Sequence, residues 1–278
     1  IDSFSNLLIE RKGAIIANNF YSSDFVGLNP ADKILDIGIP NRDNMLGWKS
    51  RQAGYSPFEL KRNAKTQYDL DSPLDLIPLS ITAAAEGRLG EAIDCLSFEH
   101  NEIEQILPLL TDAQSSIKIA GRIGSTTWKY FEKCAACETN IVSEGRGLFA
   151  SGKLDRSEQK FVTYGLLERM GYKNMLEYLL GDSDALFLDT RVLFAGKGIW
   201  PEKPDRFWSD LKKPEKIDNY FTKSLTEASL EFEKPIILCG HSMISGALYL
   251  MADKAWELVN PKSKRVQPKT LSLDNGRW

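Results

Sequence analysis

Short apolar runs that alternate with helical or turn-like segments are the feature that most limits how this 278-residue chain can fold. The first strand-like runs lie at 33–38, 55–60, 76–83, 92–98 and 116–120. Runs of this length are typical of buried parallel strands, and parallel strands need crossover connections, which are almost always right-handed. We therefore predict an α/β fold, with a Rossmann-like, mostly parallel sheet and helices on both faces.

The rest of the chain extends this pattern. We predict helices at 2–20, 102–110 and 157–170, the last with Gly171 as its stop, and a mostly helical segment at 127–180. Further predictions are a strand at 185–194, an irregular connection at 196–220, a last strand at 235–239 and a last helix at 247–258. We accordingly divide the chain into a core domain, 1–195, and a C-terminal extension, 196–278, that packs on the core and adds a strand and a helix.

Charge and hydropathy exclude several classes of partner. The formal net charge of −3 lacks the basic excess typical of nucleic-acid-binding domains, so no nucleic-acid partner is expected. No apolar stretch approaches the ~20 residues that a membrane-spanning helix needs, so we expect no membrane span. The sequence holds no Asn-x-Ser/Thr sequon, and we expect a cytoplasmic protein.

One cysteine pair has metal-ligand spacing. Cys134 and Cys137 are separated by two alanines, but a structural zinc site needs four ligands and usually a second close pair. We predict no metal site, and we interpret the pair as cysteines on successive turns of a helix.

The ends of the predicted strands suggest a ligand site. In doubly wound sheets, ligands bind outside the carboxyl ends of the strands. The first run ends in Asp36-Ile37-Gly38, where backbone could approach a cofactor, and the second ends in Glu59, at a spacing suited to an acid that binds ribose hydroxyls. Thr82 and Ala83 end the third run, and the segment from Ser97 through Phe98 and Glu99 to His100 ends the fourth.

These motifs resemble a known family. The chain is similar to the FkbM-type S-adenosylmethionine (SAM)-dependent methyltransferases over about residues 30 to 120. The motifs that carry the resemblance are Ile34-Leu35-Asp36-Ile37-Gly38, Pro57-Phe58-Glu59, and Ile93-Asp94 leading to Asn101-Glu102-Ile103-Glu104. The resemblance implies that the cofactor is SAM, held by Asp36, Ile37, Gly38 and Glu59, with Thr82 and Ala83 beside the adenine and Ser97 and Phe98 near the methyl group.

The resemblance also implies a reaction. Methyl transfer to a hydroxyl needs alignment and a general base, and Glu99 and His100 are the candidates for that base. The expected acceptor is a hydroxyl of a sugar, another glycan or a small metabolite. Ile39-Pro40 stands where the family has a further glycine in its cofactor loop, so a non-catalytic binding or scaffold protein with the same fold is an alternative.

Short motifs in the sequence resemble those of two other enzyme classes. Asp182 and Asp184 could hold a divalent metal on a sugar nucleotide, as in a metal-dependent glycosyltransferase, and this stays an alternative. Gly240-His241-Ser242 resembles the nucleophile turn of a serine hydrolase, but Ile244 stands where that pattern needs glycine and no histidine follows His241. A serine hydrolase is therefore excluded.

Overall fold

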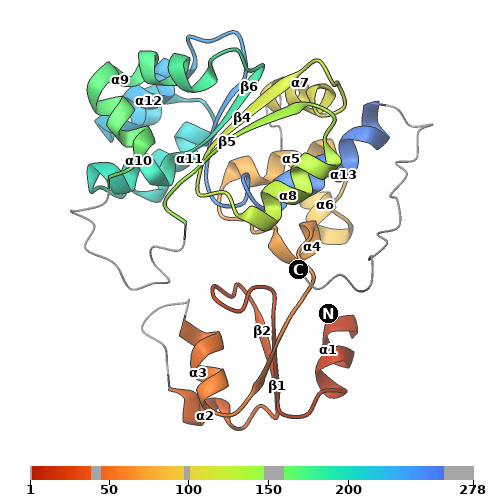
Figure 1. Cartoon of the computed structure of the whole chain (residues 1–278). Helices are drawn as coiled ribbons and strands as arrows, with labels where there is room; N and C mark the ends of the chain where they lie inside the picture. The colour runs from red at the N-terminus through yellow and green to blue at the C-terminus, as the bar shows by residue number, and fades with distance from the viewer. Residues whose placement is uncertain (1, 39–44, 97–100, 147–159, 260–278) are drawn as a thin grey trace, which may run out of the picture.

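The computed structural model describes residues 2–38, 45–96, 101–146 and 160–259. Within these ranges the chain forms two separate sheets, which lie in the two parts of the molecule seen in Figure 1. We call the part that contains residues 2–63 the N-terminal lobe and the part that contains residues 64–259 the main lobe.

The N-terminal lobe is built on a small mixed sheet with the strand order β2-β1-β3. The central strand pairs antiparallel with β2 and parallel with β3. The elements of this lobe are α1 (Asp2–Ile9), β1 (Ala14–Ala17), β2 (Val26–Asn29), α2 (Ile34–Ile37), α3 (Leu46–Gln52) and β3 (Ser56–Glu59).

The main lobe contains a four-stranded sheet in which every strand is parallel to its neighbours. Its strands are β4 (Ser116–Gly121), β5 (Glu138–Ser143), β6 (Ala185–Asp189) and β7 (Ile236–Cys239), in the spatial order β5-β4-β6-β7. The chain thus starts in the interior of the sheet, adds a strand on one side, and returns to add two strands on the other.

Helices cover both faces of this sheet. They are α4 (Ala64–Gln67), α5 (Leu76–Ile81), α6 (Gly87–Asp94), α7 (Asn101–Leu109), α8 (Ser125–Cys134), α9 (Val162–Leu180), α10 (Thr190–Lys197), α11 (Lys203–Asp210), α12 (Tyr220–Ser229) and α13 (Gly246–Val259), with short 3-10 turns at Pro73–Asp75 and Pro214–Lys216.

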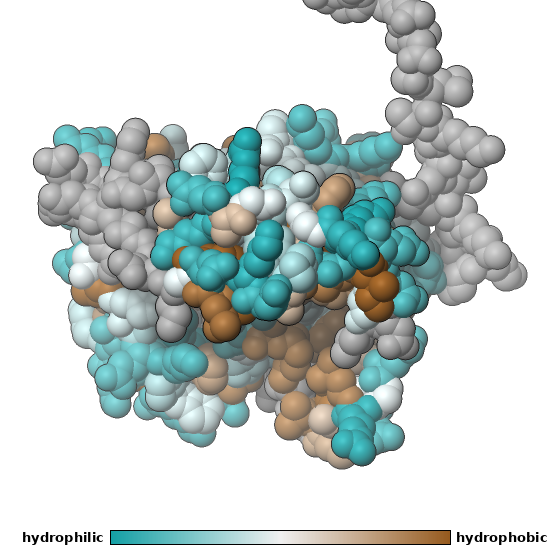
Figure 2. Space-filling view, turned by 90° about the horizontal axis from the view of Figure 1, so that it is seen from below, coloured by the Kyte–Doolittle hydropathy of each residue, from teal (hydrophilic) through white to brown (hydrophobic). Residues whose placement is uncertain are grey.

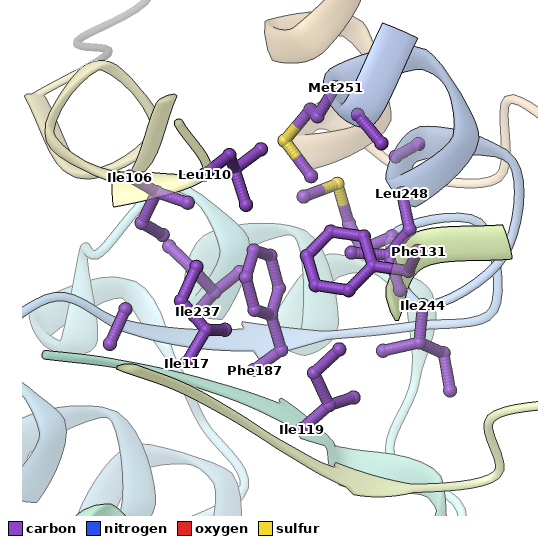
Figure 3. Packing of buried hydrophobic residues seen from close by; sticks show 14 of the residues in the cluster. Ile106, Leu110, Ile117, Ile119, Phe131, Phe187, Ile237, Ile244, Leu248 and Met251 are labelled. Carbon is purple, nitrogen blue, oxygen red and sulfur yellow. The ribbon is translucent and has the colours of Figure 1, made fainter. Parts of the chain in front are cut away.

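Alternate side chains of each strand enter different cores, as a sheet with two buried faces requires. Phe187 of β6 packs under α7, α8 and α13 in the cluster of Figure 3, whereas its neighbours Leu186 and Leu188 pack with α9, α10 and α12. The predicted Rossmann-like α/β class is confirmed by this parallel sheet with helices on both faces.

Several predicted strands are helices. The run at 33–38 forms α2 rather than a strand, and Ile34 and Leu35 are 47% and 85% exposed. The run at 76–83 forms α5, in which Pro78 occupies the first turn, where its missing N–H loses no helical hydrogen bond. The run at 92–98 begins inside α6, and 97–98 lie outside the described residues.

Other predicted elements agree with the structure or shift in extent. The predicted strands at 55–60, 116–120 and 235–239 are β3, β4 and β7, and the predicted helices at 102–110 and 247–258 are α7 and α13. The run at 185–194 is β6 followed by α10, and the connection at 196–220 contains α11. Gly171, predicted to stop a helix, has φ 78° and ends the first of two helices that meet at a kink within α9, so this prediction is confirmed.

Three strands were not predicted. Strand β1 lies in the segment predicted to be helical at 2–20, β2 was not identified, and β5 lies in the segment predicted to be mostly helical at 127–180. The predicted extension, 196–278, supplies β7 and α13, which belong to the main sheet and its core.

Candidate functional site

The residues predicted to bind SAM lie on different elements. Asp36 and Ile37 are in α2, Gly38 follows it, and Glu59 ends β3, all in the N-terminal lobe. Thr82 and Ala83 follow α5 in the main lobe. Ser97, Phe98, Glu99 and His100, which include both candidate bases, lie outside the described residues.

The described members of this set make their contacts in different parts of the molecule. Asp36 acts electrostatically on Tyr55, which precedes β3, whereas Glu59 lies at the opposite end of that strand. The Glu59 carboxylate accepts hydrogen bonds from the Phe20 backbone N–H and from Arg62 Nε, each at 3.0 Å. The Thr82 hydroxyl donates to the Pro78 carbonyl at 2.6 Å.

The residues considered as metal ligands lie in other parts of the main lobe. Asp182 and Asp184 precede β6, at the amino edge of the sheet, where Asp184 accepts from the Ser116 N–H at 2.9 Å and pairs with Lys234 at 3.4 Å. Cys134 ends α8, but Cys137 follows in a turn, so the prediction of two helical cysteines was wrong for the second. Among the described residues no three histidine, cysteine or acidic side chains are grouped as metal ligands.

The strand order points to a different location. Because β4 connects outward to β5 while β6 returns to the other side of β4, the strand order reverses between β4 and β6. Ligands of open α/β sheets bind at the carboxyl edge at such a reversal. Here that edge is formed by Gly121 with Arg122, by Asp189, and by Cys239 with His241.

The loop after β4 is shaped by two glycines. Gly121 has φ +129°, and a Cβ built on it would lie 2.3 Å from the Cβ of Asp189, so only glycine allows β4 and β6 to approach here. Gly124 is the N-cap of α8, and a Cβ there would lie 2.8 Å from the guanidinium carbon of Arg146. Arg146 is therefore seated on the start of α8, with Nη1 donating to the Arg122 carbonyl at 3.5 Å.

Asp189 organises the neighbouring strand end. Its buried carboxylate accepts hydrogen bonds from the Arg122 N–H at 3.1 Å, from the Arg191 N–H at 3.1 Å and from Arg191 Nε at 2.7 Å. It thus caps α10, fixes the loop after β4 and holds the Arg191 guanidinium. Asp189 is a positioning residue whose bonds are made within the protein.

Arg122, Arg146 and Arg191 form a group that we call the arginine cluster. Burial, followed by repulsion from Arg191, lowers the pKa of Arg122 to about 10. Burial opposes the charge of Arg191 too, but its ion pair with Asp189 raises its pKa. Burial and the positive charge of Arg191 also lower the pKa of His241 to about 4, so this imidazole is neutral at pH 7. Three guanidinium groups and a neutral imidazole therefore gather at this edge of the sheet.

A cavity of about 300 Å³ opens at this edge. Arg122, Arg191 and His241 line one part of it, and α11 lines another with Trp200 beside it. The Arg206 guanidinium lies over the Trp200 ring at 5.2 Å from its centroid. The remaining wall is acidic and comes from the turn before α5 and the end of α11, where burial raises the pKa of Asp75 to about 6 and that of Asp210 to about 7.

The sequence contained a signal for this site. Gly121-Arg122-Ile123-Gly124 follows a predicted strand, and a glycine-containing turn between a strand and a helix is the usual phosphate-binding arrangement of such folds. Because the sequence analysis predicts the first strand at 33–38, it places the ligand-binding turn at Asp36-Ile37-Gly38 instead. Arg146, Asp189 and Arg191 follow no motif that sequence alone distinguishes.

Comparisons with known proteins identify no family. No protein-family model matches the chain, and neither the curated proteins nor the solved structures gave a match. The resemblance to FkbM-type methyltransferases stays a prediction. Of the helices in the described ranges, none has the length and apolar character to cross a membrane.

Proposed function

We propose that the protein binds a phosphate-bearing small molecule at the carboxyl edge of the main sheet. The observation that carries this proposal is the arginine cluster around the reversal of strand order. Guanidinium groups donate paired hydrogen bonds to phosphate oxygens. The N-terminus of α8, which has glycine rather than an acidic residue as its N-cap, adds backbone N–H groups and a favourable dipole.

The hydrogen-bonding groups around the arginine cluster suit a phosphate, which accepts through several oxygens. The cluster brings three guanidinium groups together, and Asp189 compensates Arg191 at 2.7 Å. At the neighbouring strand β5, Glu144 accepts from the N–H groups of Val162 and Thr163 at the start of α9. Neutral His241 can donate one hydrogen bond to a bound phosphate and accept another.

The cavity is larger than a phosphate ion, and this supports an organic ligand. Aromatic side chains of Phe194, Trp200 and Phe207 line the part farther along α10 and α11. Small-molecule sites commonly combine such apolar walls with a few polar groups that fix orientation. The proposed ligand therefore has a phosphate at the arginine cluster and an apolar or aromatic portion beside Trp200.

The methyltransferase, glycosyltransferase and scaffold hypotheses stay predictions. The described residues that motivated SAM binding are separated along β3 and between the lobes, and Asp182 and Asp184 lie at the amino edge of the sheet. Titration of S-adenosylhomocysteine with wild type and Glu59→Ala remains the direct test of the first hypothesis.

The proposed function is tested by calorimetric titration of inorganic phosphate and phenyl phosphate into the wild-type protein and Arg122→Gln. We expect both ligands to bind, phenyl phosphate more tightly, and Arg122→Gln to weaken both by about 10- to 100-fold, since a charge-assisted hydrogen bond contributes about 1.5–3 kcal/mol. Arg88→Gln, which removes an exposed arginine of α6, is the matched control and should bind as wild type. Absence of binding to wild type, or unchanged binding by Arg122→Gln, would overturn the proposal.

A further inference from the structure

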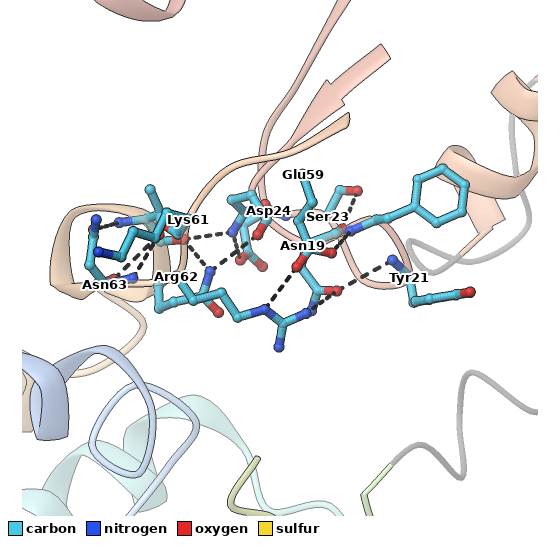
Figure 4. Close-up of polar contacts among 12 residues, drawn as sticks. Asn19, Tyr21, Ser23, Asp24, Glu59, Lys61, Arg62 and Asn63 are labelled. Atoms are coloured by element: carbon cyan, nitrogen blue, oxygen red, sulfur yellow. Dashed lines mark hydrogen bonds and ion pairs between the residues drawn. The ribbon is translucent and has the colours of Figure 1, made fainter. Parts of the chain in front are cut away.

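Arg62 is a cation that the N-terminal lobe holds at the boundary between the lobes. Its Nε donates to Glu59 Oε1 at 3.0 Å and its Nη2 to Asn19 Oδ1 at 3.2 Å. Figure 4 shows the Arg62 side chain reaching these two partners with its guanidinium end. Two contacts on different atoms fix the direction of the guanidinium group, so it is more ordered than a typical surface arginine.

Short helix α4 anchors this arginine against the main lobe. Asn63 caps α4, accepting from the Thr66 N–H at 3.2 Å, and α4 packs on α13. The approach is close, because a Cβ on Gly246 at the start of α13 would lie 2.3 Å from Tyr68 Cα. Asn18 Nδ2 also donates to the Thr66 carbonyl at 2.9 Å, which ties β1 to α4. The position of Arg62 is thus set by both lobes.

Arg146 reaches the same neighbourhood from the other side. It is seated on Gly124 at the start of α8, and α8 packs along α13 as α4 does. Desolvation and then the positive charge of Arg62 lower the pKa of Arg146, and Arg62 also acts electrostatically on Tyr249 of α13. Two guanidinium groups from different lobes therefore lie within electrostatic range of each other.

The positive charges of Arg62 and Arg146 are only partly compensated by acidic side chains among the described residues. Arg62 has one acidic partner, Glu59, whose carboxylate is also shared with the Phe20 N–H. Arg146 forms no ion pair with any residue that the structure describes. Like charges held together in this way are stabilised when an anion binds between them.

We propose that the ligand carries a second phosphate group, bound between Arg62 and Arg146, so that a diphosphate bridges the two lobes. The inference rests on the proposed function, because the first phosphate occupies the arginine cluster. The ligand class is therefore a small molecule that bears a diphosphate.

The test compares pyrophosphate with inorganic phosphate by calorimetry at one fixed salt concentration. Wild type should bind pyrophosphate at least about 10-fold more tightly, the effect of about 1.4 kcal/mol. Arg62→Gln should lose most of this preference while its affinity for inorganic phosphate changes little. Lys61→Gln removes the neighbouring exposed lysine and is the matched control, which should keep the preference.

The outcomes separate this inference from the proposed function. If neither anion binds to wild type, the proposed function and the inference both fail. If inorganic phosphate binds but pyrophosphate binds no more tightly, or if Arg62→Gln keeps the full preference, only the bridging phosphate is excluded. Arg146→Gln provides a second variant in the main lobe, and it should weaken pyrophosphate binding more than phosphate binding. Thermal unfolding of each variant checks that the fold is intact.

Discussion

The two lobes use their sheets differently. In the main lobe every residue of β6 and β7 is buried, and large apolar clusters cover both faces of the sheet. In the N-terminal lobe the four residues of β3 are all exposed, and the buried apolar cluster consists of Ile15, Ile37 and Tyr55. One sheet lies in a large packed interior, whereas the other is covered by a smaller apolar cluster and has an exposed edge strand, β3.

This difference explains where a ligand site can form. Side chains that bind a small ligand must be held in fixed positions by what surrounds them. The main sheet does this with a crowded strand junction, where Gly121 and Asp189 lie in contact and the carboxylate bonds define the Arg191 side chain. The described residues of the N-terminal lobe form a smaller interior, and the lobe's part in the proposed site is the Arg62 guanidinium, fixed by Glu59 and Asn19.

The largest expected effect contrasts two phenylalanines on strands of the two sheets. Phe187 of β6 is fully buried, whereas Phe58 of β3 is 44% exposed. Phe187→Ala leaves a cavity and should lower the free energy of unfolding by about 4 kcal/mol, while Phe58→Ala should cost about 0.5 kcal/mol. Urea denaturation followed by circular dichroism measures both. Equal losses would mean that the N-terminal sheet is as tightly packed as the main one.

A second contrast uses two glycines with positive φ. Gly121 has φ +129° and no room for a side chain, and Gly38 has φ +67° with nothing within 4 Å of a built Cβ. Gly121→Ala combines strain and overpacking and should cost about 3 kcal/mol, whereas Gly38→Ala has strain alone and should cost about 1 kcal/mol. Chemical denaturation gives both values, and phosphate titration adds a second readout. Gly121→Ala should also weaken phosphate binding by displacing the loop, and Gly38→Ala should leave it unchanged.

The contrast between the two lobes also shows how much of the fold the sequence could predict. The buried strands β6 and β7 are almost continuous apolar runs, and such runs have few alternatives to a covered parallel sheet. The run at 33–38 has similar composition, yet it folds as α2, because the central strand β1 already pairs with β2 on one side and β3 on the other. Which of two similar runs enters a sheet depends on tertiary partners, and local sequence does not contain them.

The candidate site was less predictable for a related reason. The rule that ligands bind at the carboxyl edge needs the strand order, and the wrong prediction of a first strand at 33–38 placed the expected site at Asp36 and Gly38. Asp189 and Arg191 are ordinary residues in sequence and become functional candidates only when β6 is adjacent to β4. Arg62 and Arg146 lie 84 positions apart (146 − 62) and come together only through the packing of α4 and α8 on α13.

The smallest expected effect is a change in how the free energy of unfolding depends on pH. It sharpens the comparison of the lobes because Asp75 and Asp210, whose pKa values are raised to about 6 and about 7, both belong to the main lobe. Burial raises the pKa of Asp210 to about 7, with Asp75 adding repulsion and Arg206 opposing it. The native state therefore binds a proton more tightly than the unfolded chain, so the contribution of Asp210 to stability is lost as pH rises from about 4 to about 7. Asp210→Asn should remove this loss and reduce the fall in unfolding free energy between pH 5 and pH 8 by about 2 kcal/mol.

Parallel urea denaturations of wild type and Asp210→Asn at pH 5, 6, 7 and 8 measure this difference. His241 has the opposite sign, because its lowered pKa makes the native state less stable as pH falls from about 6.5 towards 4, so only the difference between the two proteins isolates Asp210. Asp36→Asn in the N-terminal lobe is the matched control and should follow the wild-type profile. Identical profiles for all three proteins would show that the Asp210 carboxyl is not held in a desolvated cavity wall, and the acidic part of the proposed ligand cavity would have to be redrawn.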